Sequence, residues 1–395
     1  MSEKKNIQAL TGNYAAAYGA ALCKPDVIAA YPITPQSSVV ECLASMVANG
    51  EIDSDMIQVE CEHSSMSAVQ GAVAAGGRAF TATAAQGLAL MYEPYIRMST
   101  MRFPLVMALA TREMCSPGTV WSGQQDAMCV RDAGWIQMFC DSNQEILDMI
   151  IQGYMISEHP DVRIPMNVCY DGFYSSHLTE GVDIPPQETV DAFLPRTVIP
   201  EYVLHPDHPM AMDPMTPGPL LMHYRKSHLD GMEKALEVIE ETDRKFSETF
   251  GRSYGGLIEE YRNDDAEVTI ITIGGMSGTG KDAVDIAREA GIRAGLIRLR
   301  FTRPFPEKRI REALAGKKAF AVIDRSCCFG WRTGPMYMEV CAAVANAKED
   351  YYNFSVIGGL GGADIPLNHI LGTIRRLDAC KEQHGAGETE WYFTD

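Results

Sequence analysis

The sequence predicts an α/β protein built on mostly parallel sheets, and three observations support that class. Short apolar runs that resemble strands alternate with amphipathic segments that resemble helices along the first part of the chain. The apolar runs are nearly continuous, which is typical of strands covered on both faces of a parallel sheet. The alternation resumes after residue 266, so we expect a second α/β unit there.

The first part of the chain contains five expected strands and four expected helices. The expected helices lie between successive expected strands, which is the order of βαβ units. Gly50 is the stop signal of the first helix. The expected strands are 27–30, 55–62, 78–85, 103–110 and 163–171, and the expected helices are 36–50, 63–77, 86–100 and 143–158.

The middle of the chain differs in composition. Residues 183–219 are rich in proline and are expected to form an ordered arm without regular structure, because the segment is too apolar for a disordered linker. A long amphipathic helix is expected over 228–250. The chain therefore divides into a first domain of residues 1–182, an arm and helix of 183–262, and a second domain of 263–395.

In the second domain we expect strands at 267–275, 293–300, 318–326 and 353–362, with helices at 280–291 and 303–316. The glycine-rich end of the last strand, 356–362, lacks the GxGxxG order of a dinucleotide site and is interpreted as a close-packed turn.

Composition excludes several classes of function. The 395 residues carry a formal net charge of −18, which argues against nucleic-acid or anionic-membrane binding. No apolar run reaches the length of a membrane span, and the polar start lacks a signal-peptide core, so a cytoplasmic location is expected. The eleven cysteines are odd in number and irregularly spaced, which indicates reduced thiols. They form no motif for an iron–sulfur cluster, and no metal site is expected.

One nucleotide-binding motif is nearly complete and is rejected. Gly275 to Lys281 match GxxxxGK after a strand and before a helix. The next residue is Asp282, where a P-loop places a Ser or Thr hydroxyl on Mg²⁺. We interpret the segment as a glycine-rich turn whose lysine is solvated, and an NTPase or regulatory nucleotide-binding module stays only as a distant alternative.

Three polar residues each follow an expected strand. In Tyr31-Pro32-Ile33-Thr34-Pro35 the two prolines prevent both a longer strand and an early helix, so Thr34 is held in a rigid corner. Glu62 and Arg112 follow two further strands. Ligands of open parallel sheets bind beyond the carboxyl ends of the strands. One hydroxyl, one carboxylate and one guanidinium at three such ends form a candidate site.

The chain resembles the alpha subunit of the 2-oxoacid:ferredoxin oxidoreductases, most closely the pyruvate enzymes. The motif YPITP followed by the glutamate segment is specific to that family, and the similar stretches follow its order across nearly the whole chain. They are 31–41, 62–72, 81–91, 110–112, 126–138, 168–177, 299–306 and 356–362.

The resemblance implies a subunit of a thiamine-diphosphate enzyme. The first domain would be of the pyrimidine-binding type and the second would resemble the transketolase C-terminal domain. No GDG motif occurs in this chain, so thiamine diphosphate would be shared with a beta subunit. Mg²⁺ and [4Fe-4S] clusters would lie on partner subunits, which include beta, gamma and ferredoxin-like delta-type chains. Coenzyme A, ferredoxin and a 2-oxoacid would be the reactants.

The resemblance also assigns roles to residues. Glu62 would bond N1′ of the aminopyrimidine, which thiamine chemistry requires, and Glu60 is the alternative two residues upstream. Arg112 would bind the carboxylate of the substrate, since a planar guanidinium suits bidentate pairing, and Thr34 would hydrogen-bond the substrate. Three further residues would contact the cofactor, namely Pro32, Ile33 and Gln86.

Two departures from the family pattern leave the substrate open. Glu113 follows Arg112 where pyruvate enzymes carry small or apolar residues, and it either points away or competes for the guanidinium. Ala85 replaces the usual serine before Gln86. Threonine at position 34 argues against oxalate. The expected reaction is reversible oxidative decarboxylation of pyruvate to acetyl-CoA, and the alternative is an aromatic or branched 2-oxoacid such as phenylglyoxylate, indolepyruvate or 2-oxoisovalerate.

Overall fold

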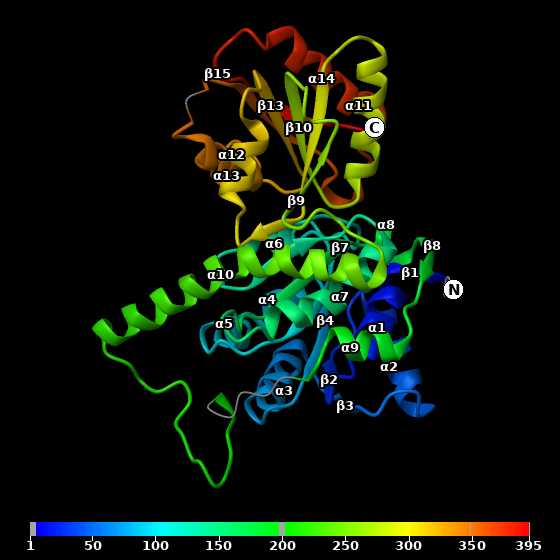
Figure 1. The fold of residues 1–395 in the computed structure, drawn as a ribbon, viewed down its shortest axis with the longest axis vertical. Coiled ribbons are helices and arrows are strands. Elements are labelled where there is room, and N and C mark those ends of the chain that lie inside the picture. The colour runs from blue at the N-terminus through cyan, green and yellow to red at the C-terminus, as the bar shows by residue number, and fades with distance from the viewer. Residues whose placement is uncertain (1–4, 197–201, 348, 395) are drawn as a thin grey trace.

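Two α/β bodies stacked one above the other make up the protein (Figure 1). The structure is a computed structural model, and it describes residues 5–196, 202–347 and 349–394. The lower body contains the first domain and the upper body the second, with the termini on different bodies (Figure 1). Within the described part of the chain, no helix is both long and apolar enough to cross a membrane.

The first domain contains a seven-stranded sheet in the order β12-β6-β7-β5-β4-β2-β3. Six strands are parallel, as the apolar runs predict, and only β12 is antiparallel to its neighbour. The strands are β2 (Val27–Ala30), β3 (Asp55–Gln58), β4 (Ala79–Thr83), β5 (Val106–Thr111), β6 (Ile136–Phe139), β7 (Met166–Asp171) and β12 (Phe301–Arg303). Every residue of β4, β5 and β7 is buried, so these strands lie at the centre of the core.

Helices cover both faces of this sheet. One group packs around α1 and α7, and the other around α3, α4 and α5. The helices are α1 (Gly12–Leu22), α2 (Ser37–Ala48), α3 (Glu62–Ala74), α4 (Ala85–Leu90), α5 (Tyr92–Thr100), α6 (Gln125–Cys129), α7 (Asn143–Ser157) and α8 (Tyr174–His177). The expected helix at 86–100 is two helices, because the chain breaks at Met91 between α4 and α5.

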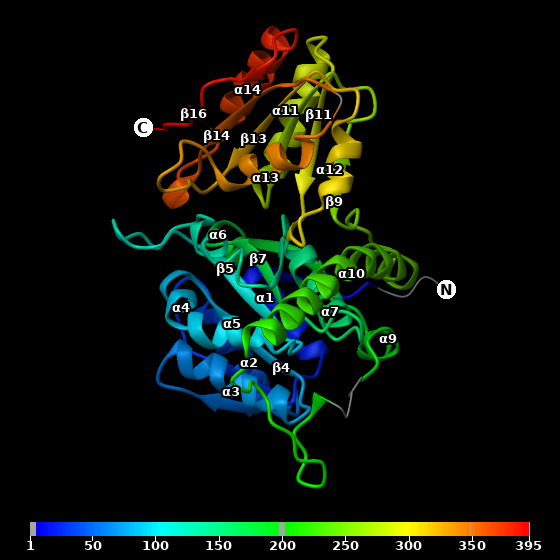
Figure 2. The ribbon, with the colours of Figure 1, turned by 90° about the vertical axis from the view of Figure 1, so that its left-hand side faces the viewer.

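The middle segment is more regular than its prolines predict. Strand β8 (Thr179–Asp183) pairs with β1 (Ile7–Thr11), and α9 (Gln187–Phe193) forms inside the expected arm. The long helix is confirmed, but α10 (Gly218–Phe250) begins ten residues earlier than predicted. Its first ten residues are all exposed and project beyond the body of the molecule in Figure 1. Figure 2 views the helix from that side, and α10 lies in front of the first domain there.

The second domain contains a seven-stranded sheet with parallel strands at its centre. Its main path is β15-β14-β13-β10-β11-β9, and β16 also pairs with β14. The strands are β9 (Ile258–Tyr261), β10 (Val268–Ile273), β11 (Ala294–Leu299), β13 (Ala319–Asp324), β14 (Tyr352–Ile357), β15 (Gly385–Ala386) and β16 (Glu390–Trp391). Helices α11 (Met276–Glu289) and α14 (Leu367–Cys380) pack on each other, as do α12 (Glu307–Leu314) and α13 (Pro335–Val344).

The strand pairing differs from the expected domain division at two points. β9 lies in the segment assigned to the arm and helix, yet it pairs with β11 of the second sheet. β12 lies in the segment assigned to the second domain, yet it pairs with β6 of the first sheet. The chain thus returns to the first domain after it has begun the second, which a linear division at residue 263 misses.

Buried charges fix this return. Arg298 lies in β11 and Arg300 directly precedes β12, and both pair with the carboxylate of Glu145 on α7. All three side chains are at most 1% exposed. The arginines hold the pKa of Glu145 down at about 2, against the effect of burial. Because a buried charge without its partner is costly, these contacts hold the two domains in one arrangement.

Candidate active site

The carboxyl ends of β2, β4 and β5 bring the predicted site residues together. These strands are neighbours in the sheet, and the chain leaves each of them at the same edge. Thr34 lies in the turn after β2, Gln86 lies in α4 after β4, and Arg112 follows β5 directly. Thr34, Gln86 and Arg112 therefore lie together at this edge of the sheet.

Arg112 is the centre of the cluster. The residue is 8% exposed, and its guanidinium donates to the carbonyl oxygen of Thr34 at 2.7 Å and to Oε1 of Gln86 at 2.9 Å. Its Nε donates to the carbonyl oxygen of Thr119 at 3.1 Å. A guanidinium has five N–H groups, so two remain, one on each terminal nitrogen. The side chain is thus fixed in place and still able to bind a carboxylate.

Glu62 is buried at the start of α3, where its carboxylate is near α4. The residue is 6% exposed and takes the first helical position. The approach is possible because residue 87 is glycine. A Cβ at Gly87 would lie 2.7 Å from Oε1 of Glu62 and 2.5 Å from Oγ1 of Thr83. Gly87 therefore acts as the spacer between Glu62 and the helix that carries Gln86, a role that no sequence pattern indicated.

Glu60, the alternative to Glu62, has a different environment. Its side chain is exposed, and its carboxylate accepts a hydrogen bond of 2.5 Å from Ser64. Helix α3 begins between the two residues, with Cys61 as the N-cap, so they do not share a face. The geometry favours Glu62.

The turn that carries Thr34 is held by a residue from another helix. Asn13 on α1 is fully buried and donates to the carbonyl oxygen of Pro35 at 2.7 Å and to Oγ of Ser38 at 2.8 Å. Gln36 closes the turn by donating to the carbonyl oxygen of Tyr31 at 2.8 Å. Thr34 itself is exposed, so its hydroxyl is available to a ligand. The predicted rigid corner exists, and Asn13 supports it in addition to the prolines.

Pro32 and Ile33, predicted to contact the cofactor, lie in the same turn. Pro32 is exposed and Ile33 is half-buried. The carbonyl oxygen of Ile33 accepts a hydrogen bond of 2.8 Å from the backbone N–H of Gln36. Both residues therefore belong to the surface of the site, beside Thr34.

Asp126 ties two parts of the site together. Its Oδ2 accepts the backbone N–H of Ala85 at 2.9 Å and that of Arg112 at 3.0 Å. The carboxyl is fully buried, and burial raises its pKa to about 7 although the N–H groups oppose the shift. Asp126 belongs to a stretch that supported the resemblance, but no residue pattern indicated that it would join α4 to β5.

Glu113 points away from Arg112. The backbone N–H of Gly361 in the second domain hydrogen-bonds its carboxylate, and Arg325 lies close enough to lower its pKa. Burial outweighs both effects and raises the pKa of Glu113 to about 7. Of the two interpretations of Glu113, the geometry selects the one in which it does not compete for the guanidinium.

The rejected P-loop is not a loop. Residues Met276 to Lys281 form the first turns of α11, so no open turn of backbone N–H groups exists there. The expectation that the lysine is solvated is wrong, because Lys281 forms an ion pair of 2.5 Å with Glu259 and is only 26% exposed. Gly280 is a packing residue, since a Cβ there would lie 2.7 Å from Leu296.

The residues present fit the pyrimidine side of thiamine diphosphate. Oγ1 of Thr83, which lies near the Glu62 carboxylate across Gly87, and Nε2 of Gln86 are buried without a hydrogen-bond partner among the described residues. Unpaired polar atoms of this kind are costly and mark a place for a polar ligand. The described residues contain no group of three side chains that could hold a metal ion.

Comparison with known proteins agrees with this geometry. Residues 18–244 match the profile of the family described as pyruvate flavodoxin/ferredoxin oxidoreductase, thiamine diphosphate-binding. Residues 266–370 match core domain II of pyruvate:ferredoxin oxidoreductase. Fold and site define a subunit of a thiamine-diphosphate-dependent oxidoreductase that acts on 2-oxoacids. The chain belongs to the 2-oxoacid:ferredoxin oxidoreductase family, with the pyrimidine-type and transketolase-like domains that the sequence predicts.

Two relatives of known name match almost the whole chain. The alpha subunit of NADH-dependent phenylglyoxylate dehydrogenase from Aromatoleum evansii is 46% identical over 383 residues, which cover 95% of this chain and 92% of the relative. The pyruvate synthase subunit PorA of Methanothermobacter thermautotrophicus is 43% identical over 372 residues, which cover 94% and 95%. The chain is therefore one subunit of a multi-subunit enzyme.

Solved structures support the fold. A 2-oxoglutarate:ferredoxin oxidoreductase from Magnetococcus marinus matches with a TM-score of 0.70 at 20% identity, covering 95% of this chain and 66% of that chain. A split-gene transketolase matches with a TM-score of 0.56 at 12% identity and covers 95% of this chain.

Proposed function

We propose that this chain supplies the pyrimidine-side half of an active site that oxidatively decarboxylates a 2-oxoacid. The observation that carries the proposal is the joined cluster of Thr34, Gln86 and Arg112 beside the buried carboxylate of Glu62. Thiamine diphosphate, when bound, supplies the carbanion chemistry that cleaves the bond between the carboxyl and carbonyl carbons of a 2-oxoacid.

In this proposal Glu62 controls the protonation state of the aminopyrimidine ring of the cofactor. A carboxylate facing N1′ of the aminopyrimidine favours the protonated ring nitrogen, which a neutral side chain does not do. Its burial between α3 and α4 keeps water from competing for that hydrogen bond. We propose that Gln86, Pro32 and Ile33 also contact the cofactor.

Arg112 and Thr34 form the substrate side. The two free N–H groups of Arg112 suit the two oxygens of one carboxylate, and the exposed hydroxyl of Thr34 suits the carbonyl oxygen. The three hydrogen bonds that Arg112 already makes hold its plane still, so little side-chain entropy is lost when substrate binds.

The partner subunits complete the enzyme in this proposal. A beta subunit would hold the pyrophosphate and Mg²⁺, and gamma and ferredoxin-like delta-type subunits would carry the [4Fe-4S] clusters. Coenzyme A would take up the acyl group, and ferredoxin would accept the electrons. We place this enzyme in the cytoplasm.

Pyruvate is the substrate that we propose first, since the pyruvate synthase subunits match over nearly their whole length. An aromatic 2-oxoacid is the second candidate, because the phenylglyoxylate enzyme is the more similar of the two relatives at 46% identity against 43%. Glu113 does not discriminate between the two candidate substrates, because its side chain faces the second domain.

A panel of 2-oxoacids assayed with the purified complex tests the proposal. We expect coenzyme A-dependent reduction of ferredoxin with pyruvate and a kcat/KM at least tenfold lower with phenylglyoxylate. The reverse order would select the aromatic candidate. Absence of activity with every 2-oxoacid, in a complex that contains thiamine diphosphate, would contradict the function itself.

A further inference from the structure

Three neighbouring strands of the first domain are each entered through an arginine. Arg78 directly precedes β4, Arg102 lies four residues before β5, and Arg163 lies three residues before β7. The order in the sheet is β7-β5-β4, and Val106 of β5 pairs with Met166 of β7. The three side chains therefore lie at the amino edge of the sheet, and we call them the amino-edge arginines.

This edge lies opposite the candidate active site. Arg102 and Arg112 are at the two ends of β5, whose six residues span roughly 17 Å. A ligand at the amino edge thus does not share the pocket of the 2-oxoacid, and its binding would not depend on the proposed function.

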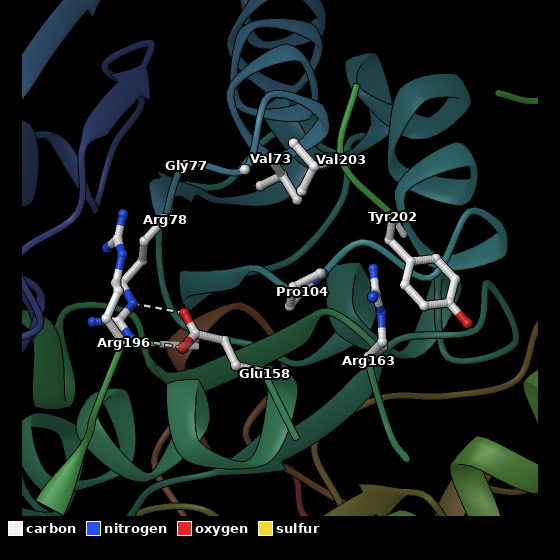
Figure 3. Close-up of a pocket in the computed structure, with 10 residues that line it drawn as sticks. Val73, Gly77, Arg78, Pro104, Glu158, Arg163, Arg196, Tyr202 and Val203 are labelled. Atoms are coloured by element: carbon white, nitrogen blue, oxygen red, sulfur yellow. Dashed lines mark hydrogen bonds and ion pairs between the residues drawn. The ribbon is translucent and has the colours of Figure 1, made fainter. Parts of the chain in front are cut away.

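Within residues 5–196, 202–347 and 349–394, a carboxylate pairs with the first of the amino-edge arginines alone. Arg78 donates to both oxygens of Glu158 at 2.6 Å, and its remaining nitrogen donates to the carbonyl oxygen of Cys23 at 2.7 Å. Its charge is thereby balanced. Figure 3 shows a pocket at this edge of the sheet. Arg78, Glu158 and Arg196 line one side of it, and Arg163 and Tyr202 line the other.

Arg163 is buried without a counter-charge among the described residues. It is 7% exposed, its Nε has no hydrogen-bond partner among the described residues, and no described carboxylate contributes to its pKa. Tyr202 covers one face of the guanidinium, with the ring centroid 3.6 Å from the central carbon. Burial and the neighbouring Arg102 lower the pKa of Arg163 to about 10. A buried cation without a partner is costly, so the fold retains it at a price in stability.

Arg102 adds a second positive charge beside it. Its guanidinium donates to the carbonyl oxygens of Asp161, Val162 and Ser227, and its Nε is buried with no partner in the part of the chain that the structure describes. Gly231 on α10 allows this contact, since a Cβ there would lie 2.7 Å from the guanidinium. Asp161 and Asp230 act on its charge through space but form no ion pair with it.

The backbone at Arg102 and Arg163 adopts a conformation that is unfavourable for a residue with a side chain. Arg102 has φ = 57° and Arg163 has φ = 48°, in the left-handed region where glycine is favoured. Both arginines begin the same pattern, since Arg102-Phe103-Pro104 and Arg163-Ile164-Pro165 each lead into a strand. The repeated placement of a bulky cation at a strained position indicates that the side chain is needed there.

The space in front of the two arginines is walled by the arm and by α10. Arg102 and Arg163 line a cavity there, and apolar side chains of the arm and helix form its other side. These side chains are Met210, Met212, Pro214, Leu221 and Tyr224. Asp161 and Asp213 also line the cavity, and Asp213 is paired with Arg97.

We propose that this cavity binds a small organic oxyanion, a carboxylate or phosphate carried on an apolar body, with Arg163 as its main ligand. The planar fork of Arg163 suits two oxygens of such a group. The apolar wall from the arm suits its hydrocarbon part, and the ligand would fix the arm against the first domain.

Calorimetry on the purified complex, loaded with thiamine diphosphate and coenzyme A at constant ionic strength, tests the site. The probes are inorganic phosphate, phenyl phosphate and benzoate. We expect the tighter of the two aromatic probes to bind at least tenfold more strongly than inorganic phosphate, because of the apolar wall. Whichever of the two binds more strongly identifies the oxyanion as phosphate or carboxylate.

Variants assign the binding to this cavity. Arg163→Gln should lower the affinity for the aromatic probe at least tenfold. Arg163→Lys keeps the charge and should lower the affinity less, and it serves as the test if the glutamine variant does not fold. Lys308→Gln removes one positive charge from a side chain on α12 that is 82% exposed, and the affinity for the probe should not change. The kcat/KM for the 2-oxoacid should be the same in all three variants.

Three results would overturn the proposal. The first is equal affinity in the wild type and both Arg163 variants. The second is an affinity that rises tenfold in Glu201→Gln, which would make the occupant an internal carboxylate from the part of the chain outside the described residues. The third is binding to the free chain that disappears in the complex, which would make the occupant a partner subunit.

Discussion

At the scale of single residues, the site is built from groups that are already held before any ligand arrives. Arg112 makes three hydrogen bonds to its own chain, and Asn13 holds the turn that carries Thr34. Preorganisation of this kind favours catalysis because the groups need not be ordered when substrate binds.

The role of Glu62 can be tested against a matched control. Glu62→Gln should fold normally, keep thiamine diphosphate bound in the complex and lose nearly all turnover, since an amide does not favour protonation of N1′. Glu60→Gln makes the same change at an exposed position and should keep full activity. Steady-state kinetics and cofactor content measured on both variants decide the matter. Full activity in Glu62→Gln together with an inactive Glu60→Gln would move the role to Glu60.

Arg112 and Thr34 should differ in the size of their effects. A charged hydrogen bond contributes about 1.5–3 kcal/mol and a neutral one about 0.5–1.5 kcal/mol. Arg112→Ala should therefore lower kcat/KM by roughly tenfold to a hundredfold or more, and Arg112→Lys should recover only part of it. Thr34→Val should lower kcat/KM about two- to tenfold. Wild-type kinetics in Arg112→Ala would show that the arginine only ties the turns together.

At the scale of elements, helix α4 connects the two halves of the site. Asp126 holds its first residue to the backbone of Arg112, and Gly87 lets it approach Glu62. Neither contact was foreseen, because both join segments that are far apart in the sequence. Local patterns predict which strand ends carry polar residues, but not which buried carboxylate or which missing Cβ brings them together.

The same difference between local patterns and long-range contacts explains which helices and strands could be predicted from the sequence. Apolar runs and helical periodicity predicted β2, β4, β5, β7, α7 and four strands of the second domain, β10, β11, β13 and β14, because burial imposes those patterns locally. Prolines misled the prediction in the arm, where α9 forms between them. Strands β6, β12 and the pair β1–β8 were missed, since their existence depends on a partner strand that short-range patterns do not identify.

A glycine substitution tests the spacing of α4. Gly87→Ala should lower kcat at least tenfold, because the new Cβ displaces the carboxylate of Glu62 or the hydroxyl of Thr83. Gly71→Ala on α3 is the control, since nothing lies within 4 Å of its added Cβ. That variant should keep full activity and gain about 0.5–1 kcal/mol of stability. Equal kinetics in the two variants would refute the spacer role.

At the scale of the whole molecule, the second domain is attached through buried charged groups. Arg325 pairs with Asp171 at 2.6 Å across the interface, and both side chains are at most 3% exposed. Together with Glu145 and its two arginines, this pair fixes where the second domain lies over the site edge. Such contacts combine residues more than 150 positions apart, which is why a linear division into domains failed at β12.

Glu113 makes the interface sensitive to pH. Its pKa in the folded protein is about 7, above the ordinary 4.5, so the fold favours the protonated carboxyl. The stability it contributes is complete below pH 4.5 and is lost as the pH rises to 7. The loss is on the order of 3 kcal/mol. Glu113→Gln, which stays neutral, should therefore match the wild type near pH 5 and melt about 4 °C or more higher at pH 8.

Differential scanning calorimetry at the two pH values measures this difference. Glu41→Gln changes an exposed carboxylate on α2 and should give the same midpoint shift, close to zero, at both pH values. A Glu113→Gln variant whose advantage does not grow with pH would show that the carboxyl is ionised in the folded protein at neutral pH.

The central claim is that this chain holds only half of a thiamine site. Titration of thiamine diphosphate with Mg²⁺, followed by calorimetry, tests it most directly on the chain alone and on the chain reassembled with its partner subunits. The charged contacts to the pyrophosphate and Mg²⁺ should dominate affinity, and the partner would supply them. We predict micromolar or tighter binding in the complex and no saturable binding to this chain alone, and micromolar binding to the isolated chain would contradict the half-site claim.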